Sequence, residues 1–279
     1  MSFSKRERIW QILLNLLLIC GGIIAMLPFW AMIIPSFTPL SKIYSGEFSF
    51  LPKYVTLEGY SKLFFETDFV RWVLNSVCVS VGSVILGIFF SSLGGFAFAK
   101  YNFKGKKQLF WIVLGSITLP QVVTIIPMYA LLNYIGWINT YQALIIPFAT
   151  NAFAIFFMRQ YIFFSIPSAM MDAAKIDGCS DFGIYYRIIL PTIRPAIATV
   201  AIFLWLWSWN AYFWPLVMLQ TSDMYTIPLG LATLYADPFH RDMSLLMAGS
   251  FLSLLPIVVV FIIMQREFIA GLTYGSIKE

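Results

Sequence analysis

The long apolar stretches of this chain constrain its fold more than any other feature. A helix that crosses a membrane needs about 20 predominantly apolar residues. Six stretches are long enough: residues 9–36, 71–99, 109–133, 139–163, 195–219 and 243–265. Hydrophobic residues make up 60% of the chain and charged residues 11%, which leaves too much apolar surface for a water-soluble globule. The sequence therefore predicts an all-α, polytopic membrane protein with six transmembrane helices.

The lysine and arginine residues are divided unevenly between the two sides of such a protein. If residues 1–8 are cytoplasmic, 13 of the 18 basic residues fall on the cytoplasmic side and 5 on the outer side. Cytoplasmic loops carry an excess of these residues, so we expect both termini in the cytoplasm. The run 9–36 exceeds the apolar core of a signal peptide and is interpreted as an uncleaved first span. The net charge of +5 could suggest nucleic acid, but the bases sit at the ends of apolar spans and form no long run, so membrane orientation explains them better.

One polar segment, residues 165–195, interrupts the apolar pattern between the fourth and fifth stretches. Pro167 suits the first turn of a helix, and no helix breaker follows until Gly178. A glycine just past a helix end can take the left-handed conformation that closes the helix, and Ser180 can then cap a second one. We expect a helix, a tight turn and a second helix on the cytoplasmic side. On spacing alone, an ordinary connection with two short surface helices explains the segment equally well.

The run from Met171 to Pro191 resembles the EAA loop of binding-protein-dependent ABC importer permeases. That loop has an E-A-A triplet, a D-G pair three residues later and a hydrophobic helix that ends in L-P. The matching residues are Asp172, Ala173, Ala174, Asp177, Gly178, Leu190 and Pro191. Asp172 stands where the family has glutamate, which keeps the charge but shortens the reach of the carboxylate.

Shorter matches continue along nearly the whole chain, and together they resemble the carbohydrate-importing, maltose-type branch of the family. They are Leu57-Glu58-Gly59-Tyr60, Asn75-Ser76, Phe103-Lys104-Gly105, Pro120, Ile126-Pro127, Trp209-Asn210, Tyr225-Thr226, Gln265-Arg266 and Gly271-Leu272.

The resemblance implies a type I ABC importer permease in the bacterial cytoplasmic membrane, with a cytoplasmic N-terminus at residues 1–8 and one transmembrane permease domain over 9–279. It implies four kinds of partner: membrane lipid, a second and different permease subunit, two ATP-binding subunits and an extracytoplasmic sugar-binding protein. Loop 165–195 would couple the permease to the ATPase. The chain has no Walker A sequence for binding ATP itself. We therefore expect no catalytic residue and no cofactor, with ATP bound by the partner subunit.

The fifth apolar stretch carries a group of aromatic residues that could line a sugar path. Trp205, Trp209 and Tyr212 fall on one helix face, with Asn210 beside them. Aromatic rings stack on the apolar faces of sugars, and an amide can bond to hydroxyl groups. The alternative is an aromatic belt at the membrane interface, or simple packing, because this half of the span lies near the outer surface.

The second apolar stretch carries small residues at intervals of four. They are Ser83, Gly87, Ser91 and Gly95. Such residues form a groove in which another membrane helix can pack closely. The partner helix could belong to this chain or to the second permease subunit.

Other chemistry is sparse. The cysteines Cys20, Cys78 and Cys179 are far apart, and with one histidine the chain offers no metal-ligand pattern. Two alternatives to a sugar permease remain. A permease for amino acids or peptides would share the EAA loop, whereas a membrane enzyme acting on lipid-linked sugar would need acids or a metal site at the outer surface. The residues that could serve there are Asp223, Asp237, His240 and Asp242.

Overall fold

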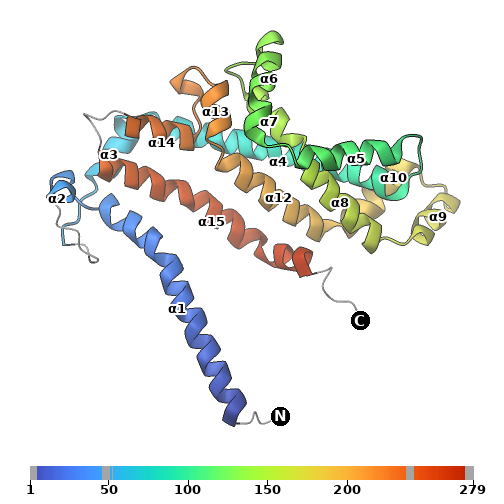
Figure 1. The fold of residues 1–279 in the computed structure, drawn as a ribbon, viewed down its shortest axis with the longest axis horizontal. Helices are drawn as coiled ribbons and strands as arrows, with labels where there is room; N and C mark the ends of the chain where they lie inside the picture. The colour runs from blue at the N-terminus through green and yellow to red at the C-terminus, as the bar shows by residue number, and fades with distance from the viewer. Residues whose placement is uncertain (1–4, 46–50, 52, 237–241, 274–279) are drawn as a thin grey trace. The chain divides into compact units, whose positions relative to one another are not determined.

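The computed structural model describes residues 5–45, 51, 53–236 and 242–273. Within these ranges the regular structure is entirely helical and includes no β-strand (Figure 1). Contacts divide the chain into unit 1, Met1–Phe69 with Leu231–Leu255, and unit 2, Val70–Gly230 with Pro256–Glu279. The prediction of an all-α chain is confirmed. We expected one domain over residues 9–279, and the contacts divide the chain into these two units.

Unit 1 contains α1 (Lys5–Ser36), α2 (Leu40–Tyr44), α3 (Glu58–Phe65), and parts of α14 (Ile227–Ala236) and α15 (Met243–Thr273). Most apolar side chains of α1 are exposed, Leu17 by 69%, as expected for a helix whose solvent is lipid. Its C-terminal end is held by polar contacts, with the hydroxyl oxygens of Ser36 and Tyr60 2.8 Å apart. Nearby, the ammonium group of Lys62 lies 3.1 Å from the carboxylate of Asp242.

Unit 2 contains the remaining helices. They are α4 (Phe69–Lys100), α5 (Lys106–Ile117), α6 (Gln121–Tyr134), α7 (Tyr141–Ala149), α8 (Ala152–Ser165), α9 (Ser168–Ile176), α10 (Asp181–Ile184), α11 (Leu190–Thr192), α12 (Arg194–Trp209) and α13 (Phe213–Met218). A π-helical turn covers Tyr185–Ile189, and a 3₁₀ turn covers Ser222–Met224. One core cluster joins α4, α8 and α12 through side chains that include Phe96, Met158 and Leu204.

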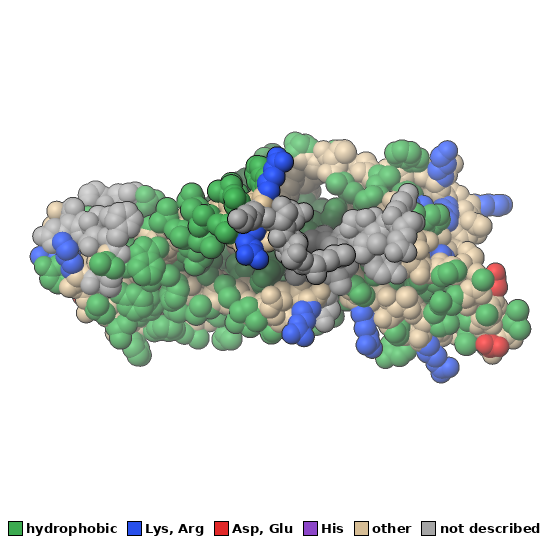
Figure 2. All heavy atoms as spheres, turned by 90° about the horizontal axis from the view of Figure 1, so that it is seen from below, with side chains coloured by type: hydrophobic (Ala, Val, Ile, Leu, Met, Phe, Trp, Pro, Cys, Tyr) green, Lys and Arg blue, Asp and Glu red, His purple; other side chains and the backbone are tan. Residues whose placement is uncertain are grey.

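Four helical segments among the described residues are long and apolar enough to cross a membrane. They are Arg8–Ser36, Phe69–Lys100, Tyr141–Ser165 and Met243–Arg266. Two bent pairs raise the number to six if each pair is one span: α5 with α6, bent by 107°, and Asp181–Thr192 with α12, bent by 78°. On the face drawn in Figure 2, hydrophobic side chains cover more area than charged side chains do. The chain is a multi-pass membrane protein.

Prolines account for two of the helix breaks, and Asn210 marks a third. Pro120 caps α6 in an extended conformation, so the predicted span 109–133 bends there. Pro195 lies in the first turn of α12, where it starts a new helix direction after Ile193. The predicted span 195–219 is not one helix, because α12 ends at Trp209 and the side chain of Asn210 bonds to the Leu206 carbonyl at 2.8 Å. Helix α13 begins separately at Phe213.

The small residues of α4 allow close contact with two other helices of the same chain. A Cβ atom at Gly95 would lie 2.7 Å from Cβ of Met158 on α8, and one at Gly87 would lie 2.5 Å from Cδ1 of Leu204 on α12. Ser83 and Ser91 are buried on this helix. The contacts of both glycines are thus made within the chain.

Candidate functional site

The first part of loop 165–195 is a short helix closed by a defined turn. Helix α9 ends at Ile176, and Gly178 follows with a φ of +77°, the left-handed conformation that glycine adopts without cost. The N–H of Cys179 bonds to the Ala174 carbonyl at 2.9 Å, and the N–H of Gly178 bonds to the Lys175 carbonyl at 3.0 Å. These two bonds form a Schellman motif, which satisfies the last carbonyls of the helix. The turn at Gly178 therefore has the geometry that its sequence predicts.

The second part of the loop begins with the predicted cap. The Ser180 hydroxyl accepts a 3.1 Å hydrogen bond from the N–H of Gly183 and starts α10. The helix then widens into the π turn, in which the N–H of Leu190 bonds to the Tyr185 carbonyl. Because Pro191 has no N–H to donate, the regular ladder could not have continued at that residue. Single π turns of this kind occur frequently at functional sites.

The structure separates the residues of the EAA match by their exposure. Asp172, Ala173, Asp177, Gly178 and Pro191 are exposed, and Leu190 is half-buried. Ala174 is buried, at 6% exposure, so only one alanine of the pair lies open to a partner.

Two large apolar side chains that the sequence motif does not include are also exposed in this loop. Ile176 is 86% exposed at the end of α9, and Phe182 is 66% exposed on α10. A helix face that combines carboxylates with protruding apolar side chains is typical of a surface that docks to another protein. Their only sequence signal was hydrophobic residues in an otherwise polar loop.

The loop is anchored to the segment that follows α4. The Tyr101 hydroxyl donates a 2.7 Å hydrogen bond to the carboxylate of Asp181, and the Lys175 ammonium lies 3.8 Å from the same oxygen. Lys175 also lies 5.5 Å from the Tyr101 ring centroid. Partial burial and the contact with the Asp181 carboxylate raise the pKa of Tyr101 to about 12, so its hydroxyl remains a donor at physiological pH.

An aromatic group continues this connection into the membrane helices. The Phe96 ring packs edge-on against Tyr101 with centroids 5.2 Å apart and stacks on Tyr185 at 5.9 Å. The hydroxyl of Tyr185, a buried residue, lies 2.7 Å from the hydroxyl of Ser92 on α4. Lys100 at the end of α4 also donates to the Ile166 carbonyl just before α9. Movement of the loop is therefore linked by direct contacts to α4.

The residues of the predicted aromatic face on α12 differ in their burial and their contacts. Trp205 and Trp209 stack on each other, with ring centroids 5.2 Å apart and planes 14° apart, and Trp209 is only 2% exposed. The ring nitrogen of Trp205 is buried, and the described residues provide it with no hydrogen-bond partner. Asn210 and Tyr212 are exposed. The four residues therefore do not form one continuous lining.

A cavity of about 970 Å³ lies where α12 ends. Helices α6, α8 and α12, with the breaks beside them, contribute polar and aromatic lining residues. They include Gln121, Thr124, Asn151, Trp207, Asn210 and Tyr212. None of the described residues that line it carries a charge. Trp205 and Trp209 lie outside the lining, so the cavity contains two of the four predicted path residues.

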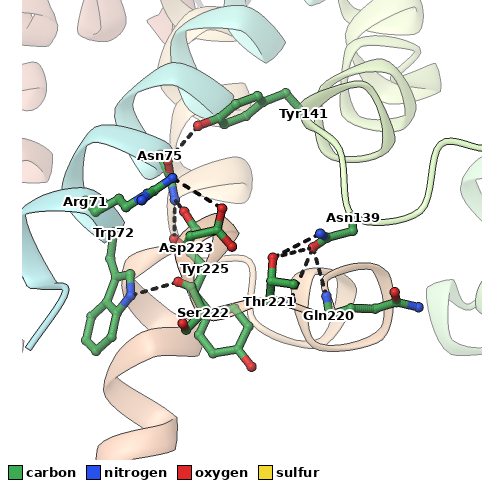
Figure 3. A network of polar contacts seen from close by, with 10 residues as sticks. All are labelled: Arg71, Trp72, Asn75, Asn139, Tyr141, Gln220, Thr221, Ser222, Asp223 and Tyr225. Atoms are coloured by element: carbon green, nitrogen blue, oxygen red, sulfur yellow. Dashed lines mark hydrogen bonds and ion pairs between the residues drawn. The ribbon is translucent and has the colours of Figure 1, made fainter.

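A network of polar contacts fixes the segment after α13 (Figure 3). The amide nitrogen of Asn75 donates at 2.9 Å to the carbonyls of Asp223 and Tyr225, and the Tyr141 hydroxyl donates to the Asn75 amide oxygen at 2.7 Å. The Arg71 guanidinium lies 3.2 Å from the Asp223 carboxylate. Sequence reasoning noted the Asn75-Ser76 pair but did not predict that it holds this loop.

Two of the acids considered for a membrane enzyme form ion pairs with basic residues. Asp223 pairs with Arg71 in unit 2, and Asp242 pairs with Lys62 in unit 1. Asp237 and His240 lie outside the described residues. Among the residues that the structure describes, no group of histidine, cysteine, aspartate or glutamate could hold a metal ion.

Comparisons with known proteins agree with this geometry. Residues 83–268 match the family described as "Binding-protein-dependent transport system inner membrane component". The arabinooligosaccharides transport system permease protein AraQ of Halalkalibacterium halodurans is 40% identical over 258 residues, 91% of this chain and 92% of the relative. The lactose transport system permease protein LacG of Rhizobium radiobacter is 30% identical over 278 residues, 100% of both chains.

The fold also matches a solved structure. A chain from the crystal structure of a bacterial ABC transporter involved in the import of the acidic polysaccharide alginate superimposes with a TM-score of 0.84 at 23% identity, over 96% of this chain and 99% of that one. The chain therefore belongs to the inner membrane components of binding-protein-dependent transport systems, the permease subunits of ABC importers.

Proposed function

We propose that this chain is one of two different permease subunits that together form the membrane path of a carbohydrate importer driven by ATP. The observation that carries the proposal is the helix and turn of loop 165–195, which is anchored through Asp181 and exposes Asp172, Asp177 and Ile176. Such a surface fits a groove on a separate ATP-binding subunit. Two of these subunits would bind and hydrolyse ATP, and this chain would carry no catalytic residue and no cofactor of its own.

Coupling would follow from different contacts in two states of the importer. Closure of the two ATPase subunits would move α9, and the contacts of Asp181 and Tyr185 would pass that movement to α4. The bend at Ile193 then connects the loop to α12, whose far end lines the 970 Å³ cavity. A ligand-driven change of this kind requires only that the ATPase bind the two states with unequal affinity.

A neutral sugar is the substrate that the cavity fits best. Amide groups from Asn151 and Asn210 can bond to sugar hydroxyls, and the rings of Trp207 and Tyr212 can stack on sugar faces. The uncharged lining gives no partner for the carboxylates of an acidic glycan. The names of the arabinooligosaccharide and lactose relatives support the same class. We assign Trp205 and Trp209 to packing, and Asn210 and Tyr212 to the path.

The membrane orientation follows the distribution of basic residues. Both termini would lie in the cytoplasm of a bacterial cell, with loop 165–195 on the same side. The extracytoplasmic sugar-binding protein would then dock on the opposite side. No observation favours an amino-acid permease or a lipid-linked sugar enzyme over this proposal.

The test is reconstitution of the complete importer. The affinity-tagged full-length chain would be purified from its own host, and mass spectrometry of the co-purified proteins would identify the second permease, the ATPase and the binding protein. Proteoliposomes containing them should take up labelled arabinooligosaccharide or lactose, but not an alginate oligosaccharide, only when ATP and the binding protein are present. Uptake without the ATPase, or uptake of amino acids in preference to sugars, would contradict the proposal.

A further inference from the structure

A second cavity, of about 430 Å³, lies between the end of α4, the start of α5 and α8. Its lining combines three aromatic rings with three bases. They are Phe98, Phe103, Phe110, Lys106, Lys107 and Arg159. The cavity lies apart from the sugar path proposed above and shares no lining residue with it.

The bases of this cavity have no acidic partner within the described part of the chain. Lys106 donates to the Tyr101 carbonyl at 2.7 Å, and Arg159 donates to the side-chain amide oxygen of Gln160. The Nε atom of Arg159 is buried and has no hydrogen-bond partner there. Like charges that share a cavity repel each other, and a buried guanidinium nitrogen without an acceptor is costly. An anion in the cavity would offset the repulsion between the bases.

One aromatic ring on α5 and one on α8 flank the guanidinium of Arg159. Its central carbon lies 4.8 Å from the Phe110 ring centroid and 5.2 Å from that of Phe163. Phe98 packs on Phe110 with centroids 5.4 Å apart. A guanidinium held between two rings is a fixed donor for phosphate, which makes this cavity more selective than a scatter of surface lysines.

The backbone adds to the attraction for an anion. Gly105, with a φ of +80°, precedes the 12-residue helix α5 and gives it no side-chain cap. The N–H of Lys106 bonds to the Phe103 carbonyl at 3.2 Å, which leaves the N–H groups of Lys107 and Gln108 to donate from the first turn. The positive end of the helix dipole points toward this turn. The cavity also lies where the candidate span α4 ends and α5 begins, which is the level of lipid headgroups.

We propose that this cavity binds the phosphate group of an anionic phospholipid, with the aromatic rings against its glycerol and upper acyl chain. Lys100 and Tyr101, beside the cavity, contact Ile166 and Asp181 of loop 165–195. A bound headgroup therefore sits next to the joint that transmits ATPase movement. The same phosphate chemistry is present in free inorganic phosphate, and the two sources are separable by experiment.

The experiment uses the full-length chain, delipidated in a neutral detergent. Native mass spectrometry would measure binding of dioleoylphosphatidylglycerol and, in parallel, of zwitterionic dioleoylphosphatidylcholine. A thermal unfolding series would be run with each lipid and with inorganic phosphate. We expect one tightly held phosphatidylglycerol and an affinity at least about tenfold above that for phosphatidylcholine, because only the anionic lipid has a net charge for the bases. Stabilisation by inorganic phosphate alone would assign the site to a soluble phosphate instead of a lipid.

Substitutions of the lining bases test whether the lipid binds in this cavity. Arg159→Gln should lower the phosphatidylglycerol affinity by about tenfold, and Lys106→Gln should lower it less, because Lys106 binds as a point charge. Arg194→Gln removes an exposed base at the first residue of α12, outside the cavity, and serves as the matched control with unchanged binding. Arg159→Lys should bind better than Arg159→Gln. Equal affinity in the wild type, Arg159→Gln and Lys106→Gln would overturn the proposal, as would equal affinity for the two lipids.

Discussion

The hydroxyl group of Tyr101 donates a 2.7 Å hydrogen bond to the carboxylate of Asp181, across 80 residues of sequence. This bond joins the segment after α4 to the second half of loop 165–195. The carboxylate also faces Lys175 of α9 at 3.8 Å, so one oxygen links both helices of the loop to α4. The ion pair is exposed and contributes little by itself, which leaves the tyrosine contact as the main tie.

Tyr101→Phe should weaken coupling without displacing the ATPase. The change removes one hydrogen bond, worth about 0.5–1.5 kcal/mol, and keeps the ring that packs on Phe96. We expect the amount of sugar imported per ATP hydrolysed to fall about two- to tenfold in proteoliposomes. Asp181→Asn should have a similar effect, and the double variant should be no worse than either. Fully additive losses in the double variant would mean that the two residues act independently.

The pH dependence of this contact follows from the raised pKa of Tyr101. A tyrosine with a folded pKa of about 12, above its usual 10.0, adds stability that is fully present below 10.0 and is lost as pH rises toward 12. The difference in unfolding temperature between the wild type and Tyr101→Phe should therefore be constant around neutral pH and shrink only in alkali. A difference that disappeared on mild acidification would indicate another titrating group.

The glycines of α4 should differ in their tolerance of alanine. At Gly95 a Cβ atom would lie 2.8 Å from the backbone nitrogen of Arg159, which cannot move aside, whereas at Gly87 the nearest atom is the end of the Leu204 side chain. Gly95→Ala should lower stability by about 1–3 kcal/mol, and Gly87→Ala by less. Gly115→Ala on α5 is the control, since nothing lies within 4 Å of its added Cβ. Thermal unfolding in detergent would rank the three, and an order with Gly95→Ala mildest would contradict the packing described here.

Substitutions in the aromatic face should affect transport at one residue and stability at another. Tyr212→Ala should slow sugar uptake several-fold in a complex that still assembles, because its ring is exposed beside the cavity. Trp209→Ala should instead destabilise the chain by about 3–5 kcal/mol, because it removes a buried stacked ring. Uptake assays scaled to the amount of assembled complex would distinguish the two. Unchanged uptake in Tyr212→Ala would remove this residue from the sugar path.

The parts of the site that sequence reasoning predicted are those with local causes. The turn at Gly178 and the cap at Ser180 depend on residues within a few positions, so composition and spacing were sufficient. The hydrogen bond from Tyr101 to Asp181 depends on how segments distant in sequence pack, and no local sequence pattern predicts that packing. The same holds for Arg159, which enters the basic cavity from a helix distant in sequence from Lys106.

Hydropathy also located apolar stretches better than it located helix ends. The predicted span 195–219 stops being helical at Trp209, where the side chain of Asn210 bonds back to the Leu206 carbonyl. An apolar count does not record the bend at Pro120, but a proline inside a span removes a backbone hydrogen bond and predicts a kinked or interrupted helix. The division of Trp209 from Tyr212 depends on that break, since residues after it no longer share a helix face with those before it.

The most direct test of the central claim is co-purification of the ATPase with the detergent-extracted complex. Gly178→Val and Asp172→Lys should leave the permease inserted but lower the ATPase recovered per permease by about tenfold. At Gly178 the added side chain has open space, so the penalty comes from the left-handed backbone alone, about 1–2 kcal/mol, and Gly178→Asn should be milder.

Glu66→Lys, an exposed acid after α3, is the control for the charge reversal. Loss of the ATPase in Gly178→Val and Asp172→Lys, with retention in Glu66→Lys, is the predicted result. Full retention with normal coupling in both loop variants would contradict the role assigned to loop 165–195.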